Sequence, residues 1–178
     1  MEEVQIKDKT FVRYIGADRI QEAIREVARR IAQDLQDQDP LYVCIMNGAF
    51  MFAAELLQLL PGDQEIAFAR YSSYEGLHSS YELKEVMPVS VPLEGRTVVI
   101  VEDLIDTGYT MECLQKRFTE LGARRVLLAA MLMKPEAVRG NISPDYIGLE
   151  IENKFIVGHG LDYDGRGRTL PDIYILKE

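Results

Sequence analysis

Apolar residues recur along the chain with two kinds of spacing. Across residues 18–36 they stand three and four positions apart, which is the pattern of one face of an amphipathic helix. Asp18 is placed to cap the start of this helix, and Gln21 stands three positions later, where it could complete a capping box. By contrast, the short unbroken apolar run of residues 41–46 predicts a strand that is buried on both faces.

Strands and helices of these two kinds alternate along most of the chain. A helix should follow residues 41–46 and end near Pro61-Gly62. This alternation predicts an α/β domain with a mainly parallel central sheet flanked by helices. Ligands of such sheets bind beyond the carboxyl ends of the strands. The further strands are expected at residues 65–73, 98–101, 124–134, 145–151, 154–160 and 172–176.

Polar residues gather where three of the predicted strands end. They are Asn47-Gly48, the stretch 102–110 and Lys134. The stretch 98–111 reads VVIVEDLIDTGYTM, a buried strand that runs into carboxylates and then into a helix start, at which Thr107 and Thr110 could serve as caps. A helix start binds anions through its unpaired N–H groups. The carboxylates beside it would repel a bare phosphate, so they need a cation, sugar hydroxyls or a proton to abstract.

Composition narrows the class of protein further. The chain has 178 residues, enough for one domain with a sizeable core. Its net charge of −9 argues against general nucleic-acid binding, and Arg29-Arg30 and Arg124-Arg125 are interpreted as solvated faces. Neither a leader pattern nor an apolar run of membrane-spanning length is visible, so a cytoplasmic protein without a membrane partner is expected. Cys44 and Cys113 are expected to be free, buried thiols.

The common nucleotide and metal signatures are missing. The sequence contains no G-x-x-x-x-G-K-[ST], no His-Glu-x-x-His and no G-x-S-x-G elbow, and Gly158-His159-Gly160 lacks a third glycine at the dinucleotide spacing. His78 and His159 are far apart in the sequence, and each is interpreted as a surface or core polar residue.

The order of residues in VVIVEDLIDTGYTM is distinctive, and it resembles the phosphoribosyl-pyrophosphate motif of type I phosphoribosyltransferases, most closely that of their hypoxanthine-guanine branch. Other blocks extend the resemblance over nearly the whole chain. MNGAFMF looks like the family's pyrophosphate loop, YSSYEGLHSSYELK like its mobile loop, MKPEAV like its purine-contacting segment, and PDYIGLEIENKFIVGHGLDYDGRGRTLP like its C-terminal hood over the base.

The resemblance implies the type I phosphoribosyltransferase fold in a single domain, residues 1–178, with a hood formed by the N-terminal segment and about residues 145–178. It implies a purine-salvage enzyme that transfers phosphoribosyl from 5-phosphoribosyl 1-pyrophosphate to hypoxanthine or guanine, with Mg²⁺, giving IMP or GMP and pyrophosphate. The partners would be small-molecule substrates, and the protein would be a homodimer or homotetramer.

The resemblance also implies roles for particular residues. Asp106 would be the catalytic base that takes the proton of purine N7. The mobile loop, expected to be poorly ordered without ligand and to close over the ribose, would contribute Ser73 and Tyr74. Mg²⁺ would be held by Glu102, Asp103 and Asp162. The purine would be bound by Lys134, Phe155, Ile156 and Asp162, and the phosphoribosyl pyrophosphate by Glu102, Asp103, Asp106, Thr107, Gly108, Tyr109, Thr110, Asn47, Gly48 and Arg168.

Two departures from the family pattern stand in the site. Asn47 occupies a position that is often basic in relatives, and Tyr109 one that is often lysine or small and polar. Alternatives are a phosphoribosyltransferase for xanthine or a pyrimidine, and a ligand-sensing regulator of the same fold that has lost catalysis. A regulator should lack Asp106 or carry a basic face. The preference between hypoxanthine and guanine stays open.

Overall fold

The computed structural model describes residues 2–74 and 82–177. Its centre is a six-stranded sheet in the order β5-β4-β3-β6-β7-β8. All neighbouring strands of this sheet are parallel except β4 and β5, which form an antiparallel pair at one edge. The mainly parallel sheet predicted from the sequence is therefore confirmed. The strands are β3 (Leu41–Ile45), β4 (Glu65–Tyr74), β5 (Glu82–Met87), β6 (Thr97–Ile105), β7 (Arg125–Met133) and β8 (Tyr146–Glu150).

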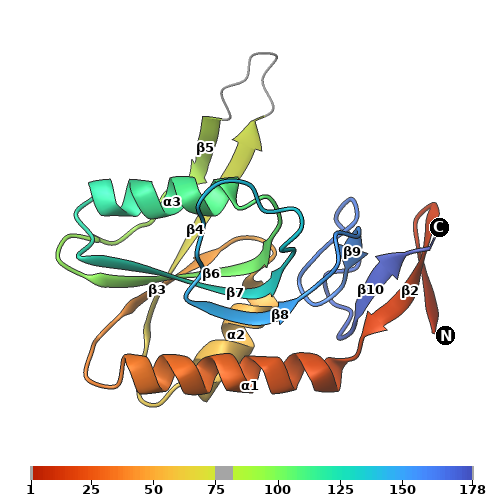
Figure 1. Ribbon diagram of the computed structural model, residues 1–178, viewed down its shortest axis with the longest axis horizontal. Helices are drawn as coiled ribbons and strands as arrows, with labels where there is room; N and C mark the ends of the chain where they lie inside the picture. Colours follow the sequence, from red (N-terminus) through yellow and green to blue (C-terminus); the bar gives the residue numbers. More distant parts are fainter. Residues whose placement is uncertain (1, 75–81, 178) are drawn as a thin grey trace.

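Helices cover both faces of this sheet (Figure 1). One face carries α1 (Ala17–Asp34) and α2 (Phe50–Leu59), and the other carries α3 (Tyr109–Glu120). The two faces have separate apolar cores. Ile24 and Phe52 pack with Val101 on the first face, whereas Leu114 and Phe118 belong to the core of the second. Buried residues from both cores therefore hold β6 in the middle of the sheet.

A second, four-stranded sheet lies to one side, in the order β1-β2-β10-β9 (Figure 1). It joins the N-terminal hairpin β1 (Glu3–Ile6) and β2 (Lys9–Ile15) to β9 (Ile156–Val157) and β10 (Ile173–Leu176). The sequence pattern had not resolved the hairpin into strands. β8 belongs to the central sheet, so the small sheet takes its C-terminal strands from residues 156–176.

The helix predicted at residues 18–36 is present as α1, but its predicted cap is wrong. The cap residue is Gly16, and no side chain of the cap residue bonds to the helix. Asp18 lies inside the first turn. The N–H of Ala17 instead donates to Asp172 Oδ1 at 2.6 Å, so a residue 155 positions away satisfies the helix start.

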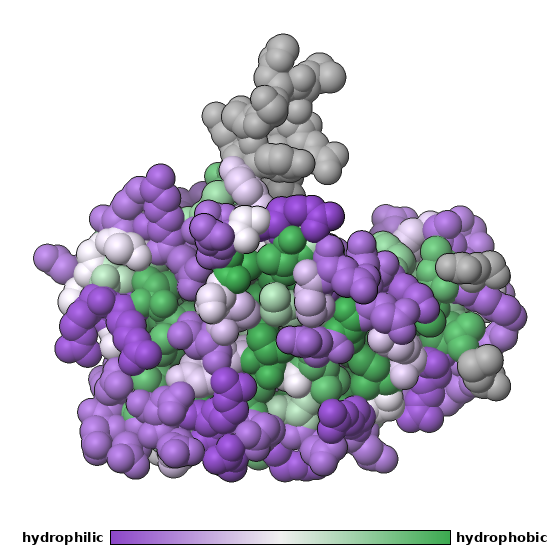
Figure 2. Space-filling model, viewed as in Figure 1, coloured by the Kyte–Doolittle hydropathy of each residue, from purple (hydrophilic) through white to green (hydrophobic). Residues whose placement is uncertain are grey.

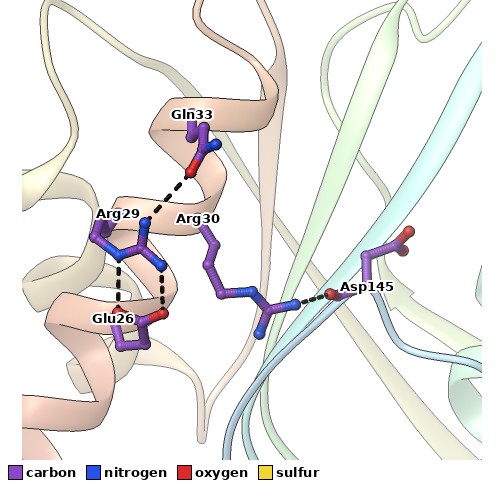
Figure 3. A network of polar contacts seen from close by, with 5 residues as sticks. All are labelled: Glu26, Arg29, Arg30, Gln33 and Asp145. Carbon is purple, nitrogen blue, oxygen red and sulfur yellow. Dashed lines mark hydrogen bonds and ion pairs between the residues drawn. The ribbon is translucent and has the colours of Figure 1, made fainter.

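The outer face of α1 confirms the amphipathic reading. The margin of the molecule along α1 is largely hydrophilic in Figure 2. Arg29 is exposed and bonds along the helix to Glu26 and Gln33 (Figure 3). Arg30 is half-buried, and it donates to the backbone oxygen of Asp145 at 2.7 Å (Figure 3). Its guanidinium also lies over the ring of Tyr146. Of the pair, only Arg29 is a solvated residue.

Both cysteines are free thiols, as expected. Burial raises the pKa of the Cys44 thiol to about 12, whereas Cys113 is only partly buried. Among residues 2–74 and 82–177, no helix is long and apolar enough to cross a membrane. The predicted mobile loop begins at Ser73 and Tyr74, which end β4, and its residues 75–81 and with them His78 lie outside the described residues.

Candidate active site at the carboxyl ends of the strands

The three polar clusters predicted at strand ends lie at neighbouring strands. β6 pairs with β3 on one side and with β7 on the other, so the segments that follow these strands start side by side. The N–H of Lys134 donates to the carbonyl of Ile105 at 2.9 Å, and the N–H of Arg139 donates to the carbonyl of Thr107 at 2.9 Å. The predicted meeting of Asn47-Gly48, residues 102–110 and Lys134 at one edge is therefore present.

The acidic pair lies inside the last part of β6, because this strand continues to Ile105 rather than ending at Val101. Glu102 is buried and accepts a hydrogen bond from the N–H of Asp103, and Asp103 accepts one from the N–H of Leu104 at 2.7 Å. Burial, with the adjacent Asp103 carboxylate as a second cause, raises the pKa of Glu102 well above its usual value. Within the described residues neither carboxylate has an ion-pair partner, so the pair favours a bound cation or hydroxyl donors.

Residues 102–108, Thr110 and Met111 line a hollow of about 230 Å³ at the start of α3. Gly108 is the cap residue of this helix with φ +82°, and a β-carbon there would lie 2.7 Å from Ile142 Cγ2. Only glycine fits this turn. Gly108 occupies the cap position and α3 begins at Tyr109, so neither Thr107 nor Thr110 is the cap residue that the sequence predicted. Among described residues, the N–H groups of Thr107 and Gly108 donate to no partner, which suits an anion.

The turn after β3 packs closely against the acidic pair. A β-carbon on Gly48 would lie 1.5 Å from Asp103 Oδ2, so any larger residue here would displace the Asp103 carboxylate. The peptide bond between Met46 and Asn47 is cis. Asn47 is exposed, and among the described residues the N–H groups of Asn47 and Gly48 donate no hydrogen bond. Two backbone donors are therefore presented beside the carboxylates.

Asp106 and Lys134 form an ion pair at the centre of the site. Lys134 Nζ lies 2.7 Å from Asp106 Oδ2. The lysine side chain is 8% exposed and the aspartate side chain 49% exposed. An ammonium group only donates hydrogen bonds and a carboxylate only accepts them. The pair therefore offers a ligand one donor and one acceptor in fixed proximity.

The small sheet supplies the remaining predicted residues. The ring of Phe155 is 49% exposed and packs edge-on against Tyr163, with ring centroids 6.0 Å apart. Ile156 is buried in β9. Asp162 accepts a hydrogen bond from the N–H of Gly165 and pairs with Arg168 Nη2 at 2.7 Å. Because Phe155 is about half exposed, it remains accessible to a ligand, while Asp162 and Arg168 hold each other.

The three carboxylates predicted to bind Mg²⁺ do not form a ready cluster. Within residues 2–74 and 82–177, no group of three or more His, Cys, Asp or Glu side chains is placed to hold a metal ion. Asp162 is engaged by Arg168, whereas Glu102 and Asp103 lie together at the end of β6.

The sequence also gave no hint of Glu55, whose Oε2 lies 2.8 Å from Nε2 of the buried His159. A single carboxylate on a helix carries no spacing signal.

This fold and this site are those of a phosphoribosyltransferase. A family model of the phosphoribosyl transferase domain matches residues 16–164 of the chain. The resemblance on which the sequence interpretation rested, and the fold it implied, are confirmed.

Similar proteins narrow the class. The chain is 39% identical over 155 residues to the hypoxanthine-guanine phosphoribosyltransferase of Streptococcus thermophilus, covering 86% of each chain. It is 34% identical to the enzyme of that name from Bacillus subtilis, covering 92% of this chain and 91% of the relative. A crystal structure of a hypoxanthine-guanine phosphoribosyltransferase from Bacillus anthracis superposes with a TM-score of 0.88 at 29% identity, over 94% of this chain and 97% of that one. The chain belongs to the hypoxanthine-guanine phosphoribosyltransferase family of enzymes.

Proposed function

We propose that this enzyme transfers the phosphoribosyl group of 5-phosphoribosyl 1-pyrophosphate to hypoxanthine or guanine, giving IMP or GMP in purine salvage. A bond forms between purine N9 and C1 of the ribose, the bond from C1 to pyrophosphate breaks, and the purine loses the proton on N7. The observation that carries the proposal is the Lys134–Asp106 pair, which stands beside the phosphate hollow and the buried acidic pair.

The ion pair matches the edge of a 6-oxopurine. Oxygen O6 accepts a hydrogen bond and N7–H donates one, and these two groups are neighbours on the purine. Lys134 would donate to O6, and Asp106 would accept the N7 proton as general base. Adenine carries an amino donor in place of O6, so the base would offer Lys134 no acceptor and would place a donor against the ammonium, at a cost of about 1–3 kcal/mol. The half-exposed ring of Phe155 would stack on the base.

The sugar phosphate would occupy the hollow at the start of α3. The free N–H groups of Thr107 and Gly108, with the hydroxyl of Thr110 and the backbone of Tyr109, would bind the 5-phosphate. Pyrophosphate would meet the N–H groups of Asn47 and Gly48. Arg168 would supply positive charge, after leaving part of its contact with Asp162.

Glu102 and Asp103 are suited to the ribose hydroxyls and to Mg²⁺. Their oxygens are the hard ligands that this ion prefers, and their lack of a cation within the described residues fits a role of this kind. When bound, Mg²⁺ would neutralise charge on the departing pyrophosphate. The backbone carbonyl of Asp162 could accept a hydrogen bond from the purine, whereas its carboxylate would reach Mg²⁺ only if its pairing with Arg168 loosens.

An assay of five bases tests the proposal. Each of hypoxanthine, guanine, xanthine, adenine and uracil is offered with phosphoribosyl pyrophosphate and Mg²⁺, and nucleotide product is quantified by chromatography. Product from hypoxanthine and guanine, with adenine and uracil refused, is expected. Preferential use of xanthine or uracil would replace the substrate assignment, and no product from any base would favour a ligand-sensing regulator.

We also propose that the protein assembles as a homodimer or homotetramer. Large apolar side chains are exposed on β4 and β5, among them Ile66 at 44%, Phe68 at 45% and Val86 at 48%. Ile66 and Phe68 are two positions apart in β4, so their side chains lie on the same face of the strand. Such a patch is suited to burial against a second copy. Light scattering coupled to size exclusion measures the assembly, and a monomer at micromolar concentration would refute it.

A further inference from the structure

His159 is a buried histidine that the proposed reaction does not use. The residue is 3% exposed and has a positive φ of +45°, which side chains other than glycine rarely adopt. Its Nε2 lies 2.8 Å from Oε2 of Glu55, which stands on α2. Because a carboxylate only accepts hydrogen bonds, Nε2 of His159 is the donor. The contact joins residues 104 positions apart.

Gly160, the residue after His159, packs directly against the turn 46–49, which follows β3 and is called the pyrophosphate turn below. Gly160 lies so close to Gly48 that a β-carbon on Gly160 would be 2.1 Å from the Gly48 carbonyl oxygen. The helix that carries Glu55 begins at Phe50, immediately after that turn. The segment 158–160 therefore contacts the turn through Gly160, and it contacts the following helix through His159.

The same segment is bonded to Arg168. The N–H of Gly160 donates to the Arg168 carbonyl at 2.9 Å, and Arg168 Nη1 donates to the Gly160 carbonyl at 2.7 Å. The guanidinium that we propose binds pyrophosphate is thus held by Gly160, and Gly160 packs directly against Gly48. The amide donors and the cation for one leaving group are held by a single chain of contacts.

A purely structural role explains this histidine poorly. Nδ1 is buried without a hydrogen-bond partner among the described residues. Leaving a buried polar atom unsatisfied destabilises the fold, and an apolar side chain would avoid it. A histidine that keeps one nitrogen unpaired while the other holds Glu55 is better explained by what the Glu55 contact fixes.

We propose that His159 is a positioning residue which, through Glu55, fixes the turn 46–49 and α2 against the segment that carries Arg168. The inference rests on the proposed function, because the group that this arrangement serves is the pyrophosphate of the cosubstrate. It assigns His159 and Glu55 to cosubstrate binding, not to the base.

Two substitutions at each position separate the hydrogen bond from packing. In His159→Gln the amide nitrogen reaches about as far as Nε2 and can donate to Glu55, whereas in His159→Asn it cannot reach, although asparagine tolerates the positive φ better. Glu55→Gln keeps an acceptor for Nε2, and Glu55→Leu removes it. KM for phosphoribosyl pyrophosphate, KM for hypoxanthine and kcat are measured for each, with the melting temperature as a check on folding.

His159→Asn and Glu55→Leu are expected to raise KM for phosphoribosyl pyrophosphate about tenfold, while KM for hypoxanthine and kcat stay within about threefold. His159→Gln and Glu55→Gln should stay within about threefold of the unaltered enzyme. Glu65→Gln, which removes an ion pair with Arg96 on the exposed start of β4, is the control and should change neither KM. A loss of kcat alone, an equal rise in both KM values, or equal behaviour of the asparagine and glutamine variants would overturn the inference. An unaltered enzyme that is inactive with every base would instead refute the proposed function.

Discussion

Nζ of Lys134 lies 2.7 Å from Oδ2 of Asp106, and the lysine is almost buried while the carboxylate is half exposed. The carboxylate therefore fixes the ammonium before any base arrives. The backbone of Lys134 is anchored separately, because its N–H donates to the carbonyl of Ile105 at the end of β6. A purine entering from solvent would meet the carboxylate first. In the proposed reaction the purine would then have to share the ammonium with that carboxylate, so recognition of O6 and removal of the N7 proton would be coupled through one contact.

Asp106→Asn is expected to lower kcat about 10²–10⁴-fold, because an amide cannot take the N7 proton. It keeps the shape of the carboxylate and an oxygen that can still accept from Lys134. KM for phosphoribosyl pyrophosphate should change little. Steady-state kinetics and a single-turnover measurement check the prediction together, since a step after chemistry can mask the loss in the steady state. Unchanged single-turnover rates would show that Asp106 is not the base.

The position of the site could be predicted from the sequence because parallel strands place their carboxyl ends at one edge. The polar residues that follow β3, β6 and β7 were visible as interruptions of apolar runs. Contacts between distant segments were not visible. Nothing local in the sequence relates Gly48 to Asp103 or His159 to Glu55, because these contacts depend on how the chain packs.

The start of α1 shows the same limit. Asp18 has the residue type and spacing of a cap, yet the N–H of Ala17 is satisfied by Asp172 of the C-terminal segment. The local pattern predicted that a helix begins here and was right. It could not reveal that a tertiary contact had displaced the local cap.

Asp172→Ala is expected to destabilise the protein by about 1–2 kcal/mol, as the loss of a capping side chain does. Asp172 also pairs with Arg13 at 3.0 Å, and that contact would be lost as well. In a chain of this size the melting temperature should fall by about 2–8 °C. Asp18→Ala is the matched control: Asp18 is exposed in the first turn, so the change should be within about 0.5 kcal/mol. Equal losses for the two variants would restore Asp18 as the cap.

Glu102→Gln is expected to stabilise the enzyme at neutral pH in the absence of substrate and metal. Burial raises the pKa of Glu102 above its ordinary value of 4.5, so the folded state holds this proton more tightly than the unfolded state. The contribution of Glu102 to stability therefore falls as pH rises from below 4.5 through its raised pKa. Glutamine has no proton to lose there.

The melting temperature of Glu102→Gln should exceed that of the unaltered enzyme by at least about 3 °C near pH 7.5, equivalent to about 1 kcal/mol, and the difference should vanish near pH 4. Glu65→Gln should instead lower the melting temperature near pH 7.5, because the hydrogen bond from Arg96 lowers the pKa of Glu65 and so the ionised carboxylate stabilises the fold. Melting curves over this pH range, recorded with EDTA, check both. A difference that does not vary with pH would show that charge burial at Glu102 is not its origin.

The turn 46–49, which we propose binds pyrophosphate, contains no basic side chain, because Asn47 stands where the family pattern often has a basic residue. We expect the N–H groups of Asn47 and Gly48 to carry most of its binding, because among the described residues both are without an acceptor. Asn47→Lys should then change the Kd of phosphoribosyl pyrophosphate less than threefold. A site short of positive charge would instead gain at least about tenfold, or roughly 1.4 kcal/mol. Gly48→Val should damage binding severely, since even its β-carbon would lie 1.5 Å from Asp103 Oδ2. Calorimetric titration of the cosubstrate with Mg²⁺ into each variant measures both effects, and a large gain for the lysine variant with an unharmed valine variant would refute backbone binding.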